Sequence, residues 1–228
     1  MSIFAIGDLH LSGIVEKPMD IFGSHWSNHW EKIKKDWNEK VTEEDAVLIP
    51  GDISWAMTLD EAIFDLQELE RLPGHKFFVK GNHDYWWKSV TKLNELFKSQ
   101  YFIQNNFYTH EEYLICGSRG WVCPNISHFT EHDKKLYERE LKRLILSLRG
   151  TQKVRDKKII VMTHFPPTND QLEPSAFTEL YEQWGVSQVI YGHLHGEHTR
   201  MGLEGDYNGV FYSLVSADYL DFQLKLIV

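Results

Sequence analysis

The stretch Ile3-Phe4-Ala5-Ile6-Gly7-Asp8-Leu9-His10 joins a short apolar run directly to a glycine, a carboxylate and an imidazole. An apolar run of four residues that is rich in Ile and Phe predicts a buried strand. The same arrangement occurs four more times along the chain. The later runs are 46–49, 77–79, 159–162 and 188–191, and the motifs after them are Gly51-Asp52, Gly81-Asn82-His83-Asp84, Thr163-His164 and Gly192-His193-Leu194-His195.

The five motifs share a position at the carboxyl end of a predicted strand. Layered α/β proteins bind ligands at that end of the sheet, so we expect the polar side chains of the motifs to converge. Together the motifs supply three aspartates, one asparagine and four or five histidines as oxygen and nitrogen donors. This donor set predicts a hydrolytic centre with two metal ions.

Helix and strand patterns alternate through the rest of the chain. Thr58 and Glu61 form a capping box that predicts a helix over 58–71. Alternation of helices and strands is typical of an α/β layered fold. The 228 residues fit a single domain over 1–228. Further helices are expected at 26–40, 88–98, 130–149 and 174–184, short β segments within 101–123, and two late strands at 210–215 and 222–228.

The composition argues against several classes of protein. The hydrophobic fraction of 42% is sufficient for a core, and the formal net charge of −9 argues against a nucleic-acid footprint. Lysines and arginines do cluster in 134–158, but acidic residues are interleaved there, which indicates a solvated helix face. No apolar run approaches the length of a membrane span.

The two cysteines and the N-terminus indicate the expected location. Cys116 and Cys123 give no disulfide framework, which predicts reduced thiols. The segment Met1-Ser2-Ile3-Phe4 lacks the basic and long apolar regions of a signal peptide. We therefore expect a cytoplasmic protein.

The spacing within the motifs suits metal coordination. Residues i and i+2 of an extended chain point to the same side, so Asp8 and His10 can reach one metal, as can His193 and His195. Glycine precedes the ligand in four of the five motifs, which allows a tight turn and a close approach of the backbone. Asp52 stands alone at its strand end and is the natural bridge between two cations. Mixed Asp, Asn and His donors favour Mn, Fe or Zn over Ca or Mg.

His83 has a different predicted role from the neighbouring motif residues. If Asn82 is a ligand, the His83 side chain should point toward the leaving group. A nearby carboxylate such as Asp84 would stabilise the imidazolium form of His83, which suits a general acid.

Taken together, the motifs resemble the calcineurin-like metallophosphoesterase superfamily, whose pattern is D-x-H, G-D, G-N-H-[DE], H and G-H-x-H in this order. The resemblance implies a four-layered αββα sandwich and two divalent metal ions. It also implies that His83 is the acid or a phosphate-contacting group. It assigns one metal to Asp8, His10, Asp52 and His195, and the second to Asp52, Asn82, His164 and His193.

The chain departs from the protein Ser/Thr phosphatase branch of this superfamily. That branch carries G-D-x-V-D-R-G, whereas this chain reads Gly51-Asp52-Ile53-Ser54-Trp55. Trp55 thus replaces the Asp that orients the catalytic histidine in that branch, and Asp84 is the candidate substitute. The form Gly81-Asn82-His83-Asp84 is more similar to phosphodiesterase-type members.

These observations predict a phosphodiesterase that acts on a small or nucleotide-like phosphate ester. A metal-bridging hydroxide would be the nucleophile, and a histidine would be the general acid. Two alternatives remain open: a phosphomonoesterase, protein phosphatases included, and a metal-binding interaction module without turnover.

Several other side chains are candidates for substrate contact. Trp55, Trp86 and Trp87 directly follow metal motifs and could line the cleft, with ordinary packing as the equal alternative. Arg119 lies between glycines and could grip a phosphate, with a structural arginine as the default. Ordinary roles are expected for the remaining histidines, which are His25, His29, His75, His110, His128, His132 and His198.

Overall fold

The computed structural model describes residues 1–125, 129–154 and 156–228, and its strands form two mixed sheets. The first sheet contains β1 (Ile3–Ala5), β2 (Ala46–Ile49), β3 (His75–Phe78), β4 (Gln100–Phe102) and β11 (Lys225–Leu226). Its strand order is β11-β1-β2-β3-β4, and only β11 runs antiparallel to its neighbour.

The second sheet also has a parallel centre, and both of its edge strands run antiparallel to their neighbours. It contains β5 (Phe107–His110), β6 (Tyr113–Ser118), β7 (Lys158–Thr163), β8 (Val186–Tyr191), β9 (Gly205–Tyr207) and β10 (Val210–Leu214). Its order is β5-β6-β7-β8-β10-β9, and β6, β7, β8 and β10 are parallel. The two predicted late strands therefore belong to different sheets.

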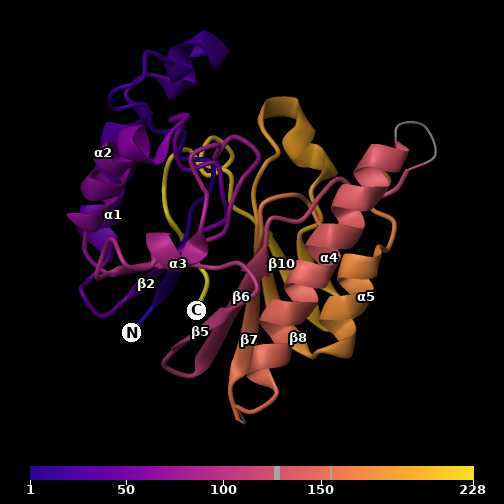
Figure 1. Cartoon of the computed structure of the whole chain (residues 1–228). Coiled ribbons are helices and arrows are strands. Elements are labelled where there is room, and N and C mark those ends of the chain that lie inside the picture. The colour runs from indigo at the N-terminus through magenta and orange to yellow at the C-terminus, as the bar shows by residue number, and fades with distance from the viewer. Residues whose placement is uncertain (126–128, 155) are drawn as a thin grey trace.

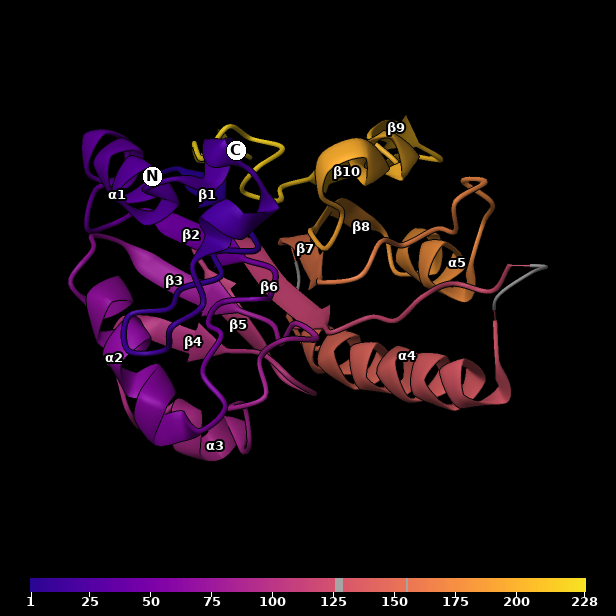
Figure 2. The same ribbon diagram turned by 90° about the horizontal axis from the view of Figure 1, so that it is seen from above.

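Helices cover the outer face of each sheet. In Figures 1 and 2, α1 (His29–Lys40) and α2 (Leu59–Glu70) lie on one side, and α4 (Glu131–Thr151) and α5 (Ala176–Gln183) lie on the other. The two sheets face each other between these helix layers. This arrangement is the four-layered αββα sandwich, so the predicted fold class is confirmed.

The continuous apolar runs of the sequence reflect burial on both faces of a strand. In β2, Val47 and Ile49 pack with the α1 and α2 layer, whereas Ala46 and Leu48 pack with residues of the second sheet. Alternate side chains of one strand thus fill two different interfaces.

Most helix predictions are confirmed, and two differ in extent. Both the Thr58 box on α2 and a second box at Thr130 on α4 are formed. Helix α3 is much shorter than the predicted 88–98 and covers only Val90–Leu93. The helix ends there because the Asn94 side chain pairs with both backbone groups of Phe102. Helix α1 begins later than predicted because Asn28 adopts a left-handed conformation.

The two sheets are joined directly at the edge where the motifs lie. After β1, the Gly7 N–H donates to Val215 O at 2.7 Å, and the Gly7 carbonyl accepts the Ala217 N–H at 3.1 Å. The carboxyl ends of β1 and β10 are therefore adjacent.

Two further observations bear on the composition-based expectations. Cys116 and Cys123 are both free and buried, as the sequence predicts. None of the helices in the described part of the chain is long and apolar enough to cross a membrane.

Candidate metal centre

The predicted ligands come from five loops that meet at the joined edge of the sheets. Asp8 and His10 follow β1, and Asp52 follows β2. Backbone pairing continues past these strands, because the Asp8 and His10 N–H groups donate to Gly51 O and Asp52 O, each at 3.0 Å. The other three loops carry Asn82 after β3, His164 after β7, and His193 with His195 after β8.

Several candidate ligands have strained backbones. Asp8, His10, Asp52 and His193 have φ values of 56°, 46°, 50° and 73°. Residues with a Cβ seldom adopt this left-handed region, and such strain clusters at functional sites. The surrounding hydrogen bonds therefore hold the motif loops in geometries that an isolated chain would avoid.

One group of donors forms around Asp8. Donor atoms of Asp8, His10 and His195 all lie within 4.8 Å of one another. The distance from His195 Nε2 to Asp8 Oδ1 is 3.8 Å, and His10 Nε2 is 3.9 Å from Asp52 Oδ2. These atoms match the ligand set expected for the first metal.

A second group of donors forms around His164. Its Nε2 lies 2.7 Å from Asn82 Oδ1, 3.2 Å from His193 Nδ1 and 3.5 Å from Asp52 Oδ2. Its Nδ1 donates to the Pro50 carbonyl at 3.0 Å, which leaves Nε2 as the nitrogen with a free lone pair. Asp52 Oδ2 thus faces a histidine nitrogen of each group. Asp8 Oδ1 also does so, at 3.8 Å from His195 Nε2 and 3.7 Å from His164 Nδ1, but that His164 nitrogen already donates to Pro50.

Burial shifts the pKa values of three candidate ligands toward their neutral forms, which leaves the two imidazoles free to bind a cation but opposes the ionisation of Asp8. Burial, together with the charge of Asp52, raises the pKa of Asp8 to about 7. Burial lowers the pKa of His164 to about 3 and that of His193 to about 2. These imidazoles are therefore neutral near pH 7, and the neutral form is the one that binds a cation.

The donors fit two divalent cations. Asp8 is fully buried and Asp52 is 2% exposed, and anions at such depth need cationic compensation. His10 Nδ1 is buried and has no hydrogen-bond partner among the described residues.

At two motif glycines, the backbone of one loop lies so close to a residue of another loop that a side chain would not fit. A methyl group on Gly81 would overlap the carboxylate and backbone nitrogen of Asp52. A methyl group on Gly192 would overlap the carboxylate of Asp8. The predicted close approach of the backbone at these glycines is confirmed, because each one gives space to a candidate ligand.

Asp84 connects two motif loops. Its buried carboxylate accepts the N–H groups of Gly81 at 2.7 Å, Asp52 at 3.0 Å and Ile53 at 2.9 Å. It also accepts the Trp86 indole N–H at 3.2 Å. In the described part of the chain, no hydrogen bond joins Asp84 to the His83 ring. The geometry therefore supports a role for Asp84 in positioning the Asp52 loop.

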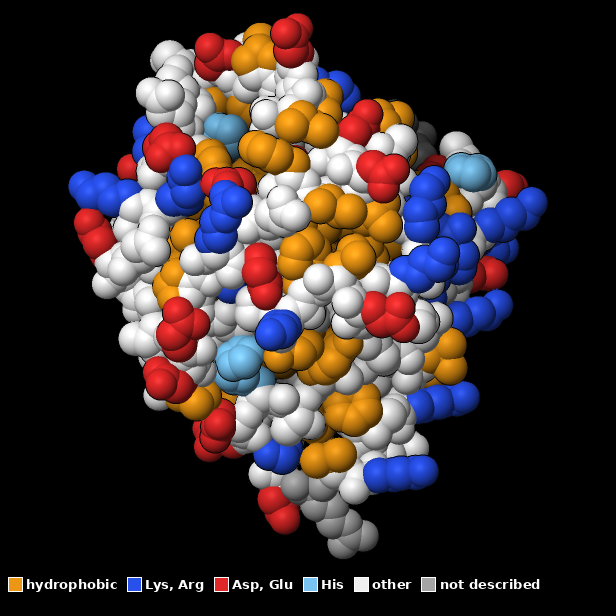
Figure 3. Space-filling view, turned by 60° about the vertical axis from the view of Figure 1, so that its left-hand side comes forward, with side chains coloured by type: hydrophobic (Ala, Val, Ile, Leu, Met, Phe, Trp, Pro, Cys, Tyr) orange, Lys and Arg blue, Asp and Glu red, His pale blue; other side chains and the backbone are white. Residues whose placement is uncertain are grey.

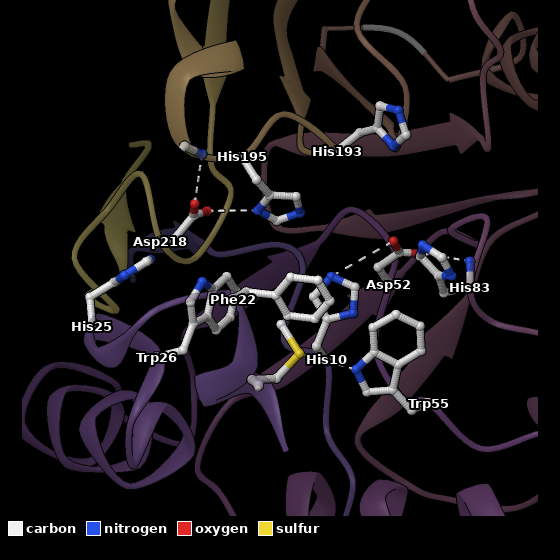
Figure 4. A pocket seen from close by; sticks show the side chains of 12 residues that line it. His10, Phe22, His25, Trp26, Asp52, Trp55, His83, His193, His195 and Asp218 are labelled. Atoms are coloured by element: carbon white, nitrogen blue, oxygen red, sulfur yellow. Dashed lines mark hydrogen bonds and ion pairs between the residues drawn. The ribbon is translucent and has the colours of Figure 1, made fainter. Parts of the chain in front are cut away.

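A cavity opens beside the two donor groups, and His83 lines it together with candidate ligands such as His10 and Asp52. The His83 N–H donates to Asp52 Oδ1 at 2.8 Å, which anchors its backbone to the candidate bridging residue. Its ring centroid is 4.5 Å from that of Trp55 and 5.8 Å from that of His10. Figure 4 shows His83 at the end of the cavity that Asp52 and Trp55 line. Its ring can therefore approach a group bound at the cavity floor.

The three candidate substrate tryptophans lie in different surroundings, because only Trp55 lines the cavity. Trp55 lines the cavity and stacks on His10 with a centroid distance of 4.7 Å. Trp86 and Trp87 are 0% and 3% exposed and pack in the core under the first sheet. Of the two alternatives for Trp86 and Trp87, the structure thus favours packing.

Arg119 is occupied by contacts away from the cavity. Its guanidinium lies 3.6 Å from the buried Glu140 carboxylate and 4.4 Å from the Trp121 ring centroid. Its carbonyl accepts the His164 N–H at 3.0 Å, so its backbone supports a candidate ligand. These contacts favour the structural alternative for its side chain.

Sequence analysis did not identify Asp218, which contacts a candidate ligand. Asp218 Oδ1 lies 2.8 Å from His195 Nδ1, and Oδ2 accepts the Gly196 N–H at 3.0 Å. Burial acts to lower the pKa of His195, but the hydrogen bond to Asp218 and the charge of Asp8 raise it to about 9. The available signal was its place shortly after β10, at the same edge of the sheets.

The other histidines are scattered. His25 lines the cavity, and the buried His29 donates from Nε2 to Leu9 O at 3.0 Å, which supports the loop that carries Asp8. His128 lies outside the described residues.

We predict that Asp218→Asn lowers metal affinity by roughly 10–100-fold, the usual effect of removing a carboxylate that orients a metal-ligating imidazole. Titration of the metal-free protein with Mn²⁺ or Zn²⁺ in a calorimeter measures this change. Asp221→Asn, at an exposed neighbouring carboxylate, is the matched control. Equal affinities in both variants would show that Asp218 does not orient His195.

Comparison with known proteins places this geometry in context. Residues 1–197 match the family described as calcineurin-like phosphoesterase. No protein of curated function matches the sequence. One similar solved structure is a protein of unknown function from Aquifex aeolicus, with 19% identity, coverage of 99% of this chain and 95% of that chain, and a TM-score of 0.53.

A second similar structure is a phosphopantetheinyl hydrolase from Mycobacterium tuberculosis, with 14% identity and a TM-score of 0.62. The alignment covers 100% of this chain and 95% of the mycobacterial one. At such identities the two structures support the fold alone. The match over residues 1–197 includes all five motifs, and the chain therefore belongs to the calcineurin-like phosphoesterase family.

Proposed function

We propose that this protein hydrolyses phosphodiesters of small organic or nucleotide-like compounds with the help of two divalent cations. The observation that carries the proposal is the position of Asp52. Its Oδ2 faces nitrogens of His10 at 3.9 Å and of His164 at 3.5 Å, as a carboxylate shared by two cations would. His83 lies in the same cavity without belonging to either donor group.

The side chains divide into holding and reacting groups. When bound, two divalent cations supply Lewis acidity at phosphorus and a water of lowered pKa. The buried aspartates and imidazoles hold the cations, and Asp84 positions the Asp52 loop. His83 donates a proton to the leaving oxygen, because its ring borders the cavity and its backbone is fixed to Asp52 Oδ1.

Apart from the two proposed cations, the side chains that line the cavity support diesters over monoesters. The described lining residues include no lysine or arginine. A monoester carries up to two negative charges on its phosphoryl group at neutral pH, whereas a diester carries one. Trp55 replaces the phosphatase-branch aspartate. The arginine that follows this aspartate in the phosphatase-branch motif is also missing, because Ala56 follows Trp55, so that motif adds no positive charge to the site. The phosphomonoesterase remains the second candidate.

Surface charge supports a small substrate. Figure 3 shows lysine and arginine side chains along one side of the molecule, with acidic side chains among them. On α4, the exposed Lys134, Lys135, Arg139 and Lys142 alternate with Glu131 and Glu138. Such mixed charge favours a solvated face over a nucleic-acid track. The free, buried cysteines support our proposal of a cytoplasmic enzyme. The backbone pairing of the two sheets through Gly7 supports our proposal of a single domain over 1–228.

The proposed activity predicts that bis-p-nitrophenyl phosphate is hydrolysed faster than p-nitrophenyl phosphate. The assay uses metal-stripped protein to which Mn, Fe, Zn or Mg is returned singly. Release of p-nitrophenol should depend on the added metal. Faster release from the monoester would support the phosphomonoesterase instead. Two bound metals without turnover of either ester would support a binding module. Phosphopantetheinyl esters merit a parallel assay that measures release of the phosphopantetheinyl group, given the name of the mycobacterial protein of similar fold.

Two variants should separate holding from reacting groups. Asp52→Asn should nearly abolish turnover and weaken metal retention, because it removes charge from the shared carboxylate. His83→Ala should lower turnover by about 10²–10⁴-fold with unchanged metal content, the range for loss of a general acid. His198→Ala, at an exposed histidine, is the control. Metal loss in the His83 variant would identify His83 as a ligand, and full activity of Asp52→Asn would contradict the bridging role.

A further inference from the structure

The cavity beside the candidate metal centre has two chemically different sides. Its volume is about 390 Å³, which suits a small molecule. The ionisable side chains of the donor groups form one side. The other side comes from two short 3₁₀ helices that precede α1, η1 (Met19–Phe22) and η2 (Ser24–Trp26), together with Trp55.

Two residues of this second side are held firmly. Trp26 is 4% exposed and packs edge-on against His29 and Phe222, with centroid distances of 5.4 and 5.1 Å. Met19 is buried, and its sulfur accepts the Trp55 indole N–H at 3.2 Å. These side chains form a fixed apolar surface beside His10.

Phe22 differs from its neighbours because it is both exposed and part of the cavity. Its side chain is 59% exposed, and no ring contact involves it among the described residues. Phe22 lines the cavity together with His10 and Trp26, and Figure 4 labels all three. An exposed aromatic ring in a cavity gains free energy when an apolar group covers it.

The surrounding surface extends this apolar character. The segment that carries Phe22 rises at the top of the molecule in Figures 1 and 3, and hydrophobic side chains are visible there in Figure 3. Ile14 and Ile21 of this segment are 54% and 73% exposed. No lysine or arginine is among the described lining residues, and His25 of η2 is the ionisable side chain on this side of the cavity. Lys17 lies close by, with Nζ 4.7 Å from the Trp55 ring centroid, but it does not line the cavity.

We propose that the organic group on the substrate's phosphorus is uncharged and apolar, and that Phe22 selects it by packing against it. This inference rests on the proposed function, since it places the phosphoryl group at the metal-holding side chains. It favours a substrate with one anionic phosphoryl group over a nucleoside diphosphate, whose additional charges would face Met19, Phe22 and Trp26.

Binding of phosphonates tests the proposal without requiring turnover. We compare methylphosphonate with phenylphosphonate on the metal-loaded protein by titration calorimetry. Phenylphosphonate should bind roughly tenfold tighter, the effect of burying about 60 Å² of apolar surface. A charged analogue, 4-carboxyphenylphosphonate, should bind more weakly than phenylphosphonate. Equal affinity for the methyl and phenyl compounds, or tighter binding of the carboxylated one, would overturn the proposal.

Variants at the cavity identify the selecting residue. Phe22→Ala should remove most of the preference for phenylphosphonate while the affinity for methylphosphonate stays unchanged. Phe22→Leu should retain part of the preference, and Ile21→Ala, an exposed neighbour outside the cavity lining, should retain all of it. Equal weakening of both phosphonates by Phe22→Ala would show that Phe22 acts on the metal centre instead. A phenyl preference in a protein that hydrolyses no ester would refute the proposed function, and it would show that Phe22 selects an apolar group in a binding site without turnover.

Discussion

The carboxylate of Asp84 holds together the two loops on which the centre depends. It accepts backbone N–H groups on both sides, from Gly81 and from Asp52 with Ile53. These donors are buried, so without Asp84 they would lose their partners at a cost of about 1–3 kcal/mol each. The hydrogen bonds bring the second and third motifs into contact, and the missing side chain of Gly81 makes room for Asp52.

Burial then determines what this arrangement can bind. Asp8 and Asp52 lie inside the protein close to several imidazoles, and the lowered pKa values of His164 and His193 leave these imidazoles neutral near pH 7. Two buried carboxylates beside neutral nitrogens form a poor site for an anion and a good one for cations. The left-handed backbone at Asp8 and Asp52 is maintained because the loops also pair with each other.

The five strand–motif units, the capping box at Thr58 and the layered architecture could be predicted from the sequence, because each depends on local periodicity or on a short pattern. The length of α3 could not, since Asn94 ends it through hydrogen bonds to Phe102 on the next strand, β4, which helical periodicity does not reveal. Asp218 was missed because its function depends on distance from His195 in space. Trp86 and Trp87 show that adjacency to a motif does not decide whether a side chain faces the cavity or the core.

Electron paramagnetic resonance of the Mn²⁺-loaded protein tests the central claim that Asp52 is shared by two cations. Metal analysis of the same sample gives the number of ions bound to each chain. The account predicts two Mn²⁺ ions per chain with an exchange-coupled spectrum, because a shared carboxylate holds the ions about 3.5–4 Å apart. One ion per chain, or two ions with the spectra of isolated Mn²⁺, would contradict it.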